Sequence, residues 1–256
     1  MLLHRVVRGA GAPVALLHGL YGQARNFATV QKRLAAAGRR VLALDLRNHG
    51  ASPQAPDMSY PEMAADVLET LRAEDALPCA LIGHSMGGKV AMCAALAKPA
   101  AVSRLLVADI APVAYAHAGA HEGYVAALAA LELRPGMTRS EADAALAAAI
   151  PDPRIRGFLL LNFVGGERPH WRINLPAIAA ALPQLVGWPE VAGRFEGPTL
   201  FLSGGRSDYV LPEHRVTIRA LFPRARQATL REAGHWLHAD DPEGFIAVAE
   251  AFLRGG

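Results

Sequence analysis

Short apolar runs alternate with amphipathic stretches over the first 110 residues and again from residue 198 to the end. Apolar runs bounded by turn residues are typical of buried strands, whereas apolar residues recurring roughly every three or four positions are typical of helices. Such alternation predicts an α/β fold with a twisted, mostly parallel sheet flanked by helices. The predicted strands are Leu2–Val7, Pro13–Leu17, Arg40–Asp45, Cys79–Ile82, Arg104–Asp109, Pro198–Leu202 and Gln227–Leu230, and the predicted helices are Phe27–Ala37, Tyr60–Ala73, Lys89–Leu96 and Pro242–Leu253.

The pattern changes between Ala111 and Val191. Here the strand-like runs stop, and the segment is rich in alanine and interrupted by prolines, which predicts several helices. Two ordinary crossover helices do not need about eighty residues, so a helical insertion between two strands is the simpler account. We therefore expect an α/β core from residues 1–110 and 192–256, with a helical cap inserted at residues 111–191.

The most informative motif joins a predicted strand to a predicted helix. Gly83-His84-Ser85-Met86-Gly87 follows the apolar run that ends at Ile82, and a helical run begins at Lys89. A serine on this kind of sharp turn stands clear of the sheet, where a base can reach its hydroxyl. Glycines two positions away on either side leave space for the turn and for the helix behind it. The motif predicts Ser85 as the nucleophile of a serine hydrolase.

A serine hydroxyl is a weak nucleophile until a neighbouring base takes its proton. His235 lies in a Gly-His loop directly after the last predicted strand, which matches a chain order of serine, acid and histidine. His214 and His238 lack this loop context, and a structural role fits them better. His235 is therefore the predicted base.

Two aspartates compete to hold the imidazole of that base. Asp208 follows the strand Pro198–Leu202, after which the acid usually comes in this order, and Asp109 ends an earlier strand. Carboxyl ends of parallel strands meet at one edge of a sheet, so both positions face the expected site. One carboxylate is enough to fix the tautomer. Position along the chain favours Asp208 slightly, and both residues stay open.

Attack on a carbonyl creates an oxyanion, which backbone N–H groups must meet. Met86, which follows the nucleophile, offers one amide, and Leu20 in the glycine-rich loop after Pro13–Leu17 offers the other. No nucleotide-binding G-x-G-x-x-G or G-x-x-x-x-G-K-[ST] motif, H-E-x-x-H motif or cysteine cluster is present. We therefore expect no cofactor and no metal.

With these residues in place, the chain resembles the cap-bearing α/β-hydrolases, and more narrowly the bacterial YbfF-type esterases and their mitochondrial hydrolase-domain relatives. The resemblance runs through nearly the whole chain, and its most specific stretches are Arg47-Asn48-His49-Gly50 and Asp109-Ile110-Ala111-Pro112. The other matching stretches are His18-Gly19-Leu20-Tyr21-Gly22, Gly83-His84-Ser85-Met86-Gly87-Gly88-Lys89, Trp171-Arg172-Ile173-Asn174 and Gly234-His235-Trp236-Leu237-His238-Ala239.

The resemblance implies cofactor-free hydrolysis of carboxylic esters, with acyl thioesters as a further substrate class. It also bears on the acid, because such relatives often lack an aspartate in the segment matching Gly204 to Val210 and keep the one matching Asp109. This implication weakens the preference for Asp208, and both aspartates are carried forward.

The expected cap carries apolar side chains that are predicted to bind a short to medium acyl chain, although packing of a helical lid is the commoner use of such residues. The predicted substrate-binding residues are Phe158, Phe163, Trp171 and Trp188. Four arginines of the same segment could meet an anionic group such as a coenzyme A phosphate, but surface charge explains them better. These are Arg154, Arg156, Arg168 and Arg172.

Composition and charge restrict the kind of partner and the cellular location that we expect. The formal net charge of +3 comes from scattered residues, without the basic blocks that nucleic acids need, so we expect a small-molecule ester and not a nucleic acid as partner. No apolar run is long enough to cross a membrane, and charges interrupt the first residues where a signal peptide needs its apolar segment. Cys79 and Cys93 read as buried free thiols. A cytoplasmic location is expected.

Three rival functions remain from the residues alone. A cofactor-free perhydrolase or a C–C bond hydrolase would use the same serine, histidine and acid with a different pocket. A small-molecule receptor that retains the hydrolase pocket is the rival from outside enzymology. The serine at the elbow excludes the haloalkane dehalogenases and epoxide hydrolases, which place an aspartate there.

Overall fold

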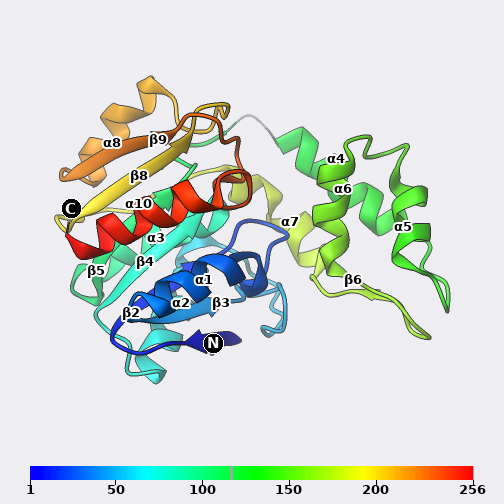
Figure 1. Cartoon of the computed structure of the whole chain (residues 1–256). Helices are drawn as coiled ribbons and strands as arrows, with labels where there is room; N and C mark the ends of the chain where they lie inside the picture. Colours follow the sequence, from blue (N-terminus) through cyan, green and yellow to red (C-terminus); the bar gives the residue numbers. More distant parts are fainter. Residues whose placement is uncertain (116–117, 256) are drawn as a thin grey trace.

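The computed structural model describes residues 1–115 and 118–255, and its main feature is a mostly parallel sheet (Figure 1). The strands of this sheet are β1 (Arg5–Arg8), β2 (Ala12–Leu17), β3 (Arg39–Leu44), β4 (Cys79–His84), β5 (Val102–Ala108), β8 (Thr199–Gly204) and β9 (Ala225–Leu230). Their order across the sheet is β1-β3-β2-β4-β5-β8-β9. In this sheet, only β1 pairs antiparallel with its neighbour within the described residues. The predicted α/β architecture is confirmed.

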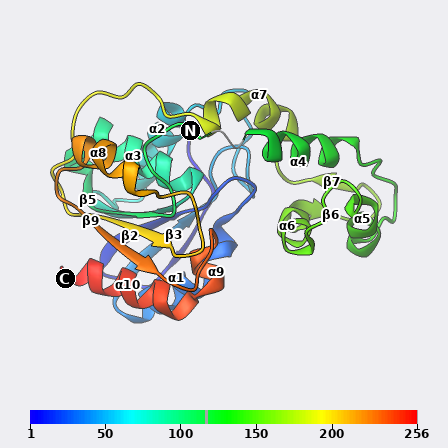
Figure 2. The ribbon, with the colours of Figure 1, turned by 90° about the horizontal axis from the view of Figure 1, so that it is seen from above.

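Helices lie on both faces of the sheet, which Figure 2 shows from above. One face carries α1 (Ala28–Ala36) and α10 (Pro242–Arg254), and the other carries α2 (Tyr60–Ala73), α3 (Met86–Ala97) and α8 (Arg215–Leu221). Shorter helical segments are η1 (Ala24–Phe27), η2 (Pro99–Ala101), η4 (Pro212–His214) and α9 (Leu237–Asp240). None of the helices in the described ranges is both long enough and apolar enough to cross a bilayer.

Because both faces of the sheet are covered, successive side chains are buried along β4 and along the last four residues of β2 and β5. In β2, Val14 and Leu16 pack in the core on the side of α1 and α10, whereas Ala15 and Leu17 pack in the core on the side of α2 and α3. All four are 0% exposed. Side chains alternate between faces along a strand, so two buried faces produce a continuous apolar run. Such runs make the strands readable from the sequence.

The central parallel strands end at one edge of the sheet. Leu17 at the end of β2 lies beside Gly83 in β4, and His84 at the end of β4 lies beside Ala108, which ends β5. Ala108 in turn pairs with Leu202 of β8. The residues that follow these strand ends therefore emerge next to one another, the usual place for a site in an open α/β sheet.

The segment between β5 and β8 lies mostly beside the sheet and not on its faces, as Figures 1 and 2 both show. It contains α4 (Ala118–Ala130), α5 (Arg139–Leu146), α6 (Pro153–Leu159), η3 (Leu160–Asn162), β6 (Phe163–Val164), β7 (His170–Trp171) and α7 (Leu175–Val186). Residues 116 and 117 of the expected cap lie outside the described residues.

Two local expectations need correction. The sequence pattern predicts no strand between residues 111 and 191, but β6 and β7 form an antiparallel pair there. Each is two residues long, too short to produce a periodic pattern. The helix expected at Phe27–Ala37 is divided: residues up to Phe27 form the 3-10 segment η1, and α1 starts at Ala28.

Candidate active site

Ser85 sits at the turn between β4 and α3 in a strained backbone conformation, with φ 52° and ψ −121°. Non-glycine residues rarely occupy this region, and doing so costs on the order of 1–3 kcal/mol. Glycines make the turn sterically feasible: a Cβ on Gly83 would lie 2.2 Å from the Gly87 carbonyl oxygen, and one on Gly87 would lie 2.3 Å from the Leu17 carbonyl oxygen. The Ser85 amide donates to the Ala108 carbonyl at 3.0 Å, which ties the turn to β5.

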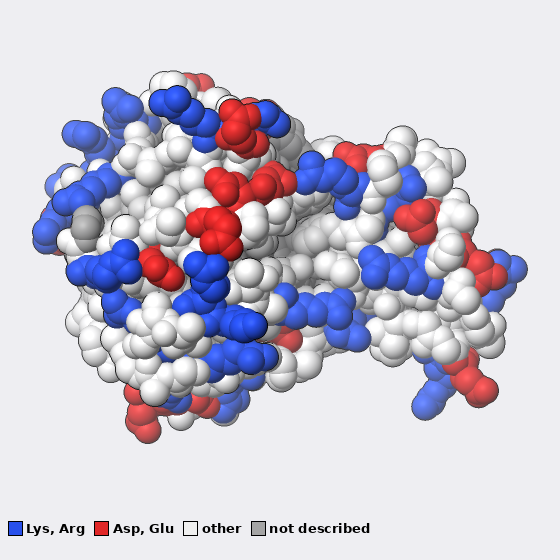
Figure 3. All heavy atoms as spheres, in the orientation of Figure 1, with Lys and Arg blue, Asp and Glu red and all other residues white. Residues whose placement is uncertain are grey.

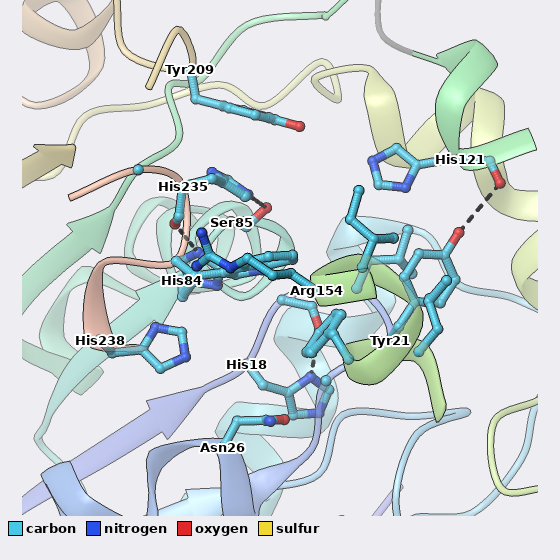
Figure 4. A pocket seen from close by; sticks show the side chains of 18 of the residues that line it. His18, Tyr21, Asn26, His84, Ser85, His121, Arg154, Tyr209, His235 and His238 are labelled. Atoms are coloured by element: carbon cyan, nitrogen blue, oxygen red, sulfur yellow. Dashed lines mark hydrogen bonds between the residues drawn. The ribbon is translucent and has the colours of Figure 1, made fainter. Parts of the chain in front are cut away.

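Ser85, His235 and Asp109 form one chain of hydrogen bonds (Figure 4 shows the serine and histidine). His235 Nδ1 lies 2.8 Å from Asp109 Oδ2, and its Nε2 lies 3.0 Å from Ser85 Oγ. An ionised carboxylate only accepts, so Nδ1 carries the proton and Nε2 is left to accept the serine hydroxyl. The imidazole is therefore in the tautomer that can take a proton from Ser85.

Asp109 is fixed in position from several sides. It follows β5 directly with φ 52°, and its side chain is 0% exposed. Its Oδ1 accepts the Gly204 amide at 2.9 Å, and its Oδ2 also accepts the Ser207 hydroxyl. A buried carboxylate needs such donors to offset its lost hydration. The donors come from the last residue of β8 and from the turn after it, the turn that also carries Asp208.

Asp208, in contrast, does not join this chain. Its residue is exposed, and no hydrogen bond or ion pair within the described ranges involves its carboxylate. The turn after β8 explains why Asp109 and Asp208 differ. The Ser207 amide donates to the Gly204 carbonyl, and the Ser207 hydroxyl donates to the Asp109 carboxylate. The structure thus places Ser207 against the buried carboxylate and leaves its neighbour in solvent. The slight preference for Asp208 is not supported by this arrangement.

Two further aromatic side chains surround the His235 ring. Tyr209 stacks on it with 3.9 Å between ring centroids and 20° between planes. His84 Nε2 donates to the His235 carbonyl at 2.7 Å, and the pKa of His84 is held well below its ordinary value by burial and by the nearby His235 and His238. His84 therefore stays neutral and fixes the loop backbone. Sequence reasoning missed both contacts, although His84 lies inside the serine motif.

The Leu20 loop lies against the serine. A Cβ on Gly19 would come within 3.3 Å of Ser85 Cβ and 3.0 Å of His84 Nδ1. Within the part of the chain that the structure describes, neither the Leu20 amide nor the Met86 amide donates a hydrogen bond. Both amides are thus available beside Ser85, and the oxyanion hole expected at these two positions stays a prediction.

Two buried histidines, His18 and His49, hold the Leu20 loop. His18 Nδ1 donates to the Gly19 carbonyl at 2.8 Å while its Nε2 accepts the Leu46 amide at 2.9 Å. His49 Nε2 accepts the Tyr21 amide at 3.1 Å. An imidazole nitrogen accepts only when it is unprotonated, so both rings must be neutral. Burial lowers the pKa of both, and burial together with His18 lowers that of His49 to about 3.

The low pKa of His49 predicts how the stability of the fold changes in acid. The unfolded chain protonates His49 below about 6.5, whereas the folded chain does so only near 3. The unfolded state therefore binds more protons, and the free energy of unfolding falls as the pH drops from 6.5 towards 3. His49→Gln, which keeps an acceptor for the Tyr21 amide, should reduce this slope by about 1.4 kcal/mol per pH unit.

Urea unfolding of wild type and variant at several pH values between about 4 and 7 measures these slopes. The exposed His170 provides the matched control, since His170→Gln should leave the slope as in the wild type. Equal slopes for the wild type and His49→Gln would contradict the assignment of His49 as a buried neutral side chain.

A cavity of about 350 Å³ opens beside Ser85, between the sheet edge and the inserted helices. Figure 3 shows the hollow between these two parts, with mostly uncharged atoms in its floor. Leu20 and His235 line the cavity from the sheet side, and Tyr124 and Phe158 line it from α4 and α6. Phe158 also contacts the ring of Trp236 at 5.4 Å between centroids.

Of the four predicted substrate-binding residues, the structure places only Phe158 in the cavity wall. Phe163 and Trp171 face each other across β6 and β7, with ring centroids 5.7 Å apart, and the Trp171 indole donates to the Leu128 carbonyl. Trp188 packs against the core. These three do not line the cavity beside Ser85. Packing within the insertion and on the core surrounds their rings, and their role in substrate binding stays a prediction.

Of the four arginines named in the insertion, only Arg154 lines the cavity beside Ser85. Arg154 lines the cavity and pairs with Asp240 at 2.6 Å, and Asp240 also accepts the Gly234 amide beside His235. Arg156 pairs with Asp143 inside the insertion. Arg168 and Arg172 do not line the cavity. Within the described ranges, no group of three or more His, Cys, Asp or Glu side chains is arranged to hold a metal.

Lys89 lies behind the serine turn with a buried side chain. Its Nζ donates to the carbonyls of Val186 and Gly187, and it lies over the rings of Tyr60 and Tyr115. Burial lowers the pKa of Lys89 to about 7. A second, smaller cavity of about 50 Å³ reaches from Ser85 to this lysine. Lys89 thus fastens the end of α7 to α3, a contact that sequence reasoning did not identify.

Comparison with known proteins agrees with this geometry. A family model described as alpha/beta hydrolase fold matches residues 12–242. The chain is 43% identical over 247 residues to the sn-1-specific diacylglycerol lipase ABHD11 of Mus musculus, covering 94% of this chain and 80% of that protein. It is 36% identical over 243 residues to esterase YbfF of Escherichia coli K12, covering 95% and 93%.

Among solved structures, one titled marine microorganism esterase superposes with a TM-score of 0.95 at 35% identity, covering 98% of this chain and 99% of that one. These matches confirm the resemblance that the motifs predicted. The chain belongs to the alpha/beta hydrolase fold family.

Proposed function

We propose that this protein is a serine esterase whose nucleophile is Ser85, with His235 as general base and Asp109 as the acid. The observation that carries the proposal is the hydrogen-bond chain through the two ring nitrogens of His235. Family membership and the esterase and lipase relatives support the class, and the chain is a carboxylic ester hydrolase.

The reaction proceeds through an acyl-enzyme. Ser85 Oγ attacks the ester carbonyl carbon as its proton passes to His235 Nε2, and the buried Asp109 carboxylate stabilises the imidazolium. The Leu20 and Met86 amides receive the oxyanion. His235 then gives the proton to the departing alcohol, which leaves an ester on Ser85. Water, activated by the same histidine, releases the acid and restores the serine.

The cavity beside Ser85 supports small ester substrates. Its volume of about 350 Å³ lies at the lower end of the range for ligand pockets, about 300–1,000 Å³. Phe158 supplies apolar surface for a short to medium acyl chain, and residues 111–191 act as the cap over the site. Acyl thioesters carry the same kind of reacting carbonyl, and we propose them as a further substrate class. We also propose a cytoplasmic location.

A panel of p-nitrophenyl esters and acyl-CoA thioesters tests the substrate class. We expect the highest kcat/KM on short to medium acyl chains and a steady fall on longer chains, because the cavity limits the length of the guest. Mass spectrometry after treatment with a fluorophosphonate should place the label on Ser85. Label on another residue, or highest turnover on long chains, would contradict the proposal.

The same panel separates the rival enzymes that share these side chains. A perhydrolase would form peracid when hydrogen peroxide is supplied, and a C–C bond hydrolase would cleave a diketone in preference to the esters. A receptor would bind a ligand tightly with ester turnover well below one per minute.

A further inference from the structure

The residue after Leu20 is held in an unusual conformation. Tyr21 is buried and has φ 63°, a left-handed value that strains a residue with a bulky side chain. It occupies the third position of a turn closed by the Gly22 amide, which donates to the Gly19 carbonyl at 2.9 Å. That position usually carries glycine or asparagine when φ is positive. Such strain persists only where the surroundings enforce it.

This turn sets the direction of the Leu20 amide. The Gly19 carbonyl and the Leu20 N–H belong to one planar trans peptide, so they point in opposite directions. Donation from the Gly22 amide and from His18 Nδ1 fixes that carbonyl. The Leu20 N–H is thereby aimed away from both donors, and its aim depends on Tyr21 keeping its left-handed conformation.

Two side chains from different parts of the chain form hydrogen bonds with the Tyr21 backbone. His49 accepts the Tyr21 amide, and Asn162 Nδ2 donates to the Tyr21 carbonyl at 2.7 Å. Asn162 ends η3, in the insertion, and is 0% exposed. Its Oδ1 has no hydrogen-bond partner among the described residues. A half-satisfied buried amide is costly compared with an apolar side chain, which points to a task for its donor group.

We propose that Asn162 is a positioning residue for ester hydrolysis: by holding the Tyr21 carbonyl, it keeps the Leu20 amide directed at the oxyanion formed on Ser85. The inference rests on the proposed function, in which Leu20 supplies one of the two oxyanion donors. The insertion then contributes to the chemistry through the backbone of the sheet edge, besides covering the cavity.

The test uses Asn162→Asp and Asn162→Ala in the full chain. The aspartate has the same shape but places an acceptor against the Tyr21 carbonyl, and the alanine removes the donor. We expect kcat to fall by about 10- to 100-fold with KM changed by less than about threefold, since loss of a whole oxyanion donor costs about 10²–10³. Affinity for a trifluoromethyl ketone, whose adduct carries the oxyanion, should fall in proportion.

A matched control comes from the neighbouring contact. Arg25 is exposed and donates to the Leu161 carbonyl at 2.9 Å, so it joins the same two segments without touching Tyr21. Arg25→Ala should keep kcat and ketone affinity within about twofold of the wild type. Melting curves of all variants show whether each is folded at the assay temperature.

The outcomes distinguish the inference from the proposed function. Wild-type kcat and ketone affinity in both folded Asn162 variants would overturn the inference while leaving the esterase assignment in place. An equal loss in Arg25→Ala would also overturn it, because a loosened junction would then explain the effect. Full activity in Ser85→Ala would instead overturn the proposed function itself.

Discussion

Ser85→Ala is expected to lower kcat for a p-nitrophenyl ester by about 10³-fold or more. The hydroxyl 3.0 Å from His235 Nε2 is the proposed nucleophile, and Ser85 is the only residue of the turn Gly83-His84-Ser85-Met86-Gly87 that carries a hydroxyl. Initial rates at saturating substrate measure the loss. Stability should change little, because the substitution removes one oxygen at the surface of the cavity.

Ser203→Ala is the matched control for this substitution. The Ser203 hydroxyl bonds within the pair of strands β8 and β9 and takes no part in the cavity. Its removal should leave kcat within about twofold of the wild type. Hydrolysis at a near-wild-type rate by Ser85→Ala, in protein free of wild-type enzyme, would refute the assignment of the nucleophile.

The second large effect is expected from Asp109→Asn, with a fall in kcat of about 10²- to 10⁴-fold. An amide can donate to His235 Nδ1, which favours the tautomer that cannot accept the Ser85 proton. Asp208→Asn should change kcat by less than about threefold, because its carboxylate is exposed and bonds to none of these groups.

Paired kinetics of the two variants, with unfolding curves for each, decide between the aspartates. Asp109 also accepts the Gly204 amide and the Ser207 hydroxyl, so some loss of stability is expected in its variant. The comparison is therefore made at a temperature where both variants are folded. A larger loss of kcat in Asp208→Asn would identify Asp208 as the acid.

The sequence predicted the fold well because its signals are local. A strand buried on both faces appears as an apolar run, and the serine motif specifies its own turn, so the motif alone places Ser85 at the end of a strand. His235 could be paired with it because the Gly-His loop follows a strand whose end meets the same edge of the sheet.

The competing aspartates show where this reasoning stopped. Both follow strand ends at one edge, and position along the chain, which slightly favoured Asp208, does not show which loop turns its carboxylate inward. The structure separates them through Ser207, whose hydroxyl bonds to Asp109 and leaves Asp208 on the outside. The catalytic roles of both residues stay a prediction.

Contacts between distant segments were also beyond the sequence. Asn162 meets Tyr21 across 141 positions of the chain, and His49 meets it across 28. Neither residue belongs to a motif that identifies its partner. The packing of Phe163 against Trp171 was unforeseen for the same reason, since a pair of two-residue strands turns these side chains towards each other.

The insertion is anchored to the sheet edge at the loops that carry His235 and Leu20. Arg154 binds Asp240, which caps the His235 loop, and Asn162 binds the backbone beside Leu20. A chimaera that grafts the lid of another hydrolase onto this scaffold must therefore carry over both anchors. A lid that is chosen for its pocket shape alone will change the specificity and will also leave the His235 and Leu20 loops without these two contacts.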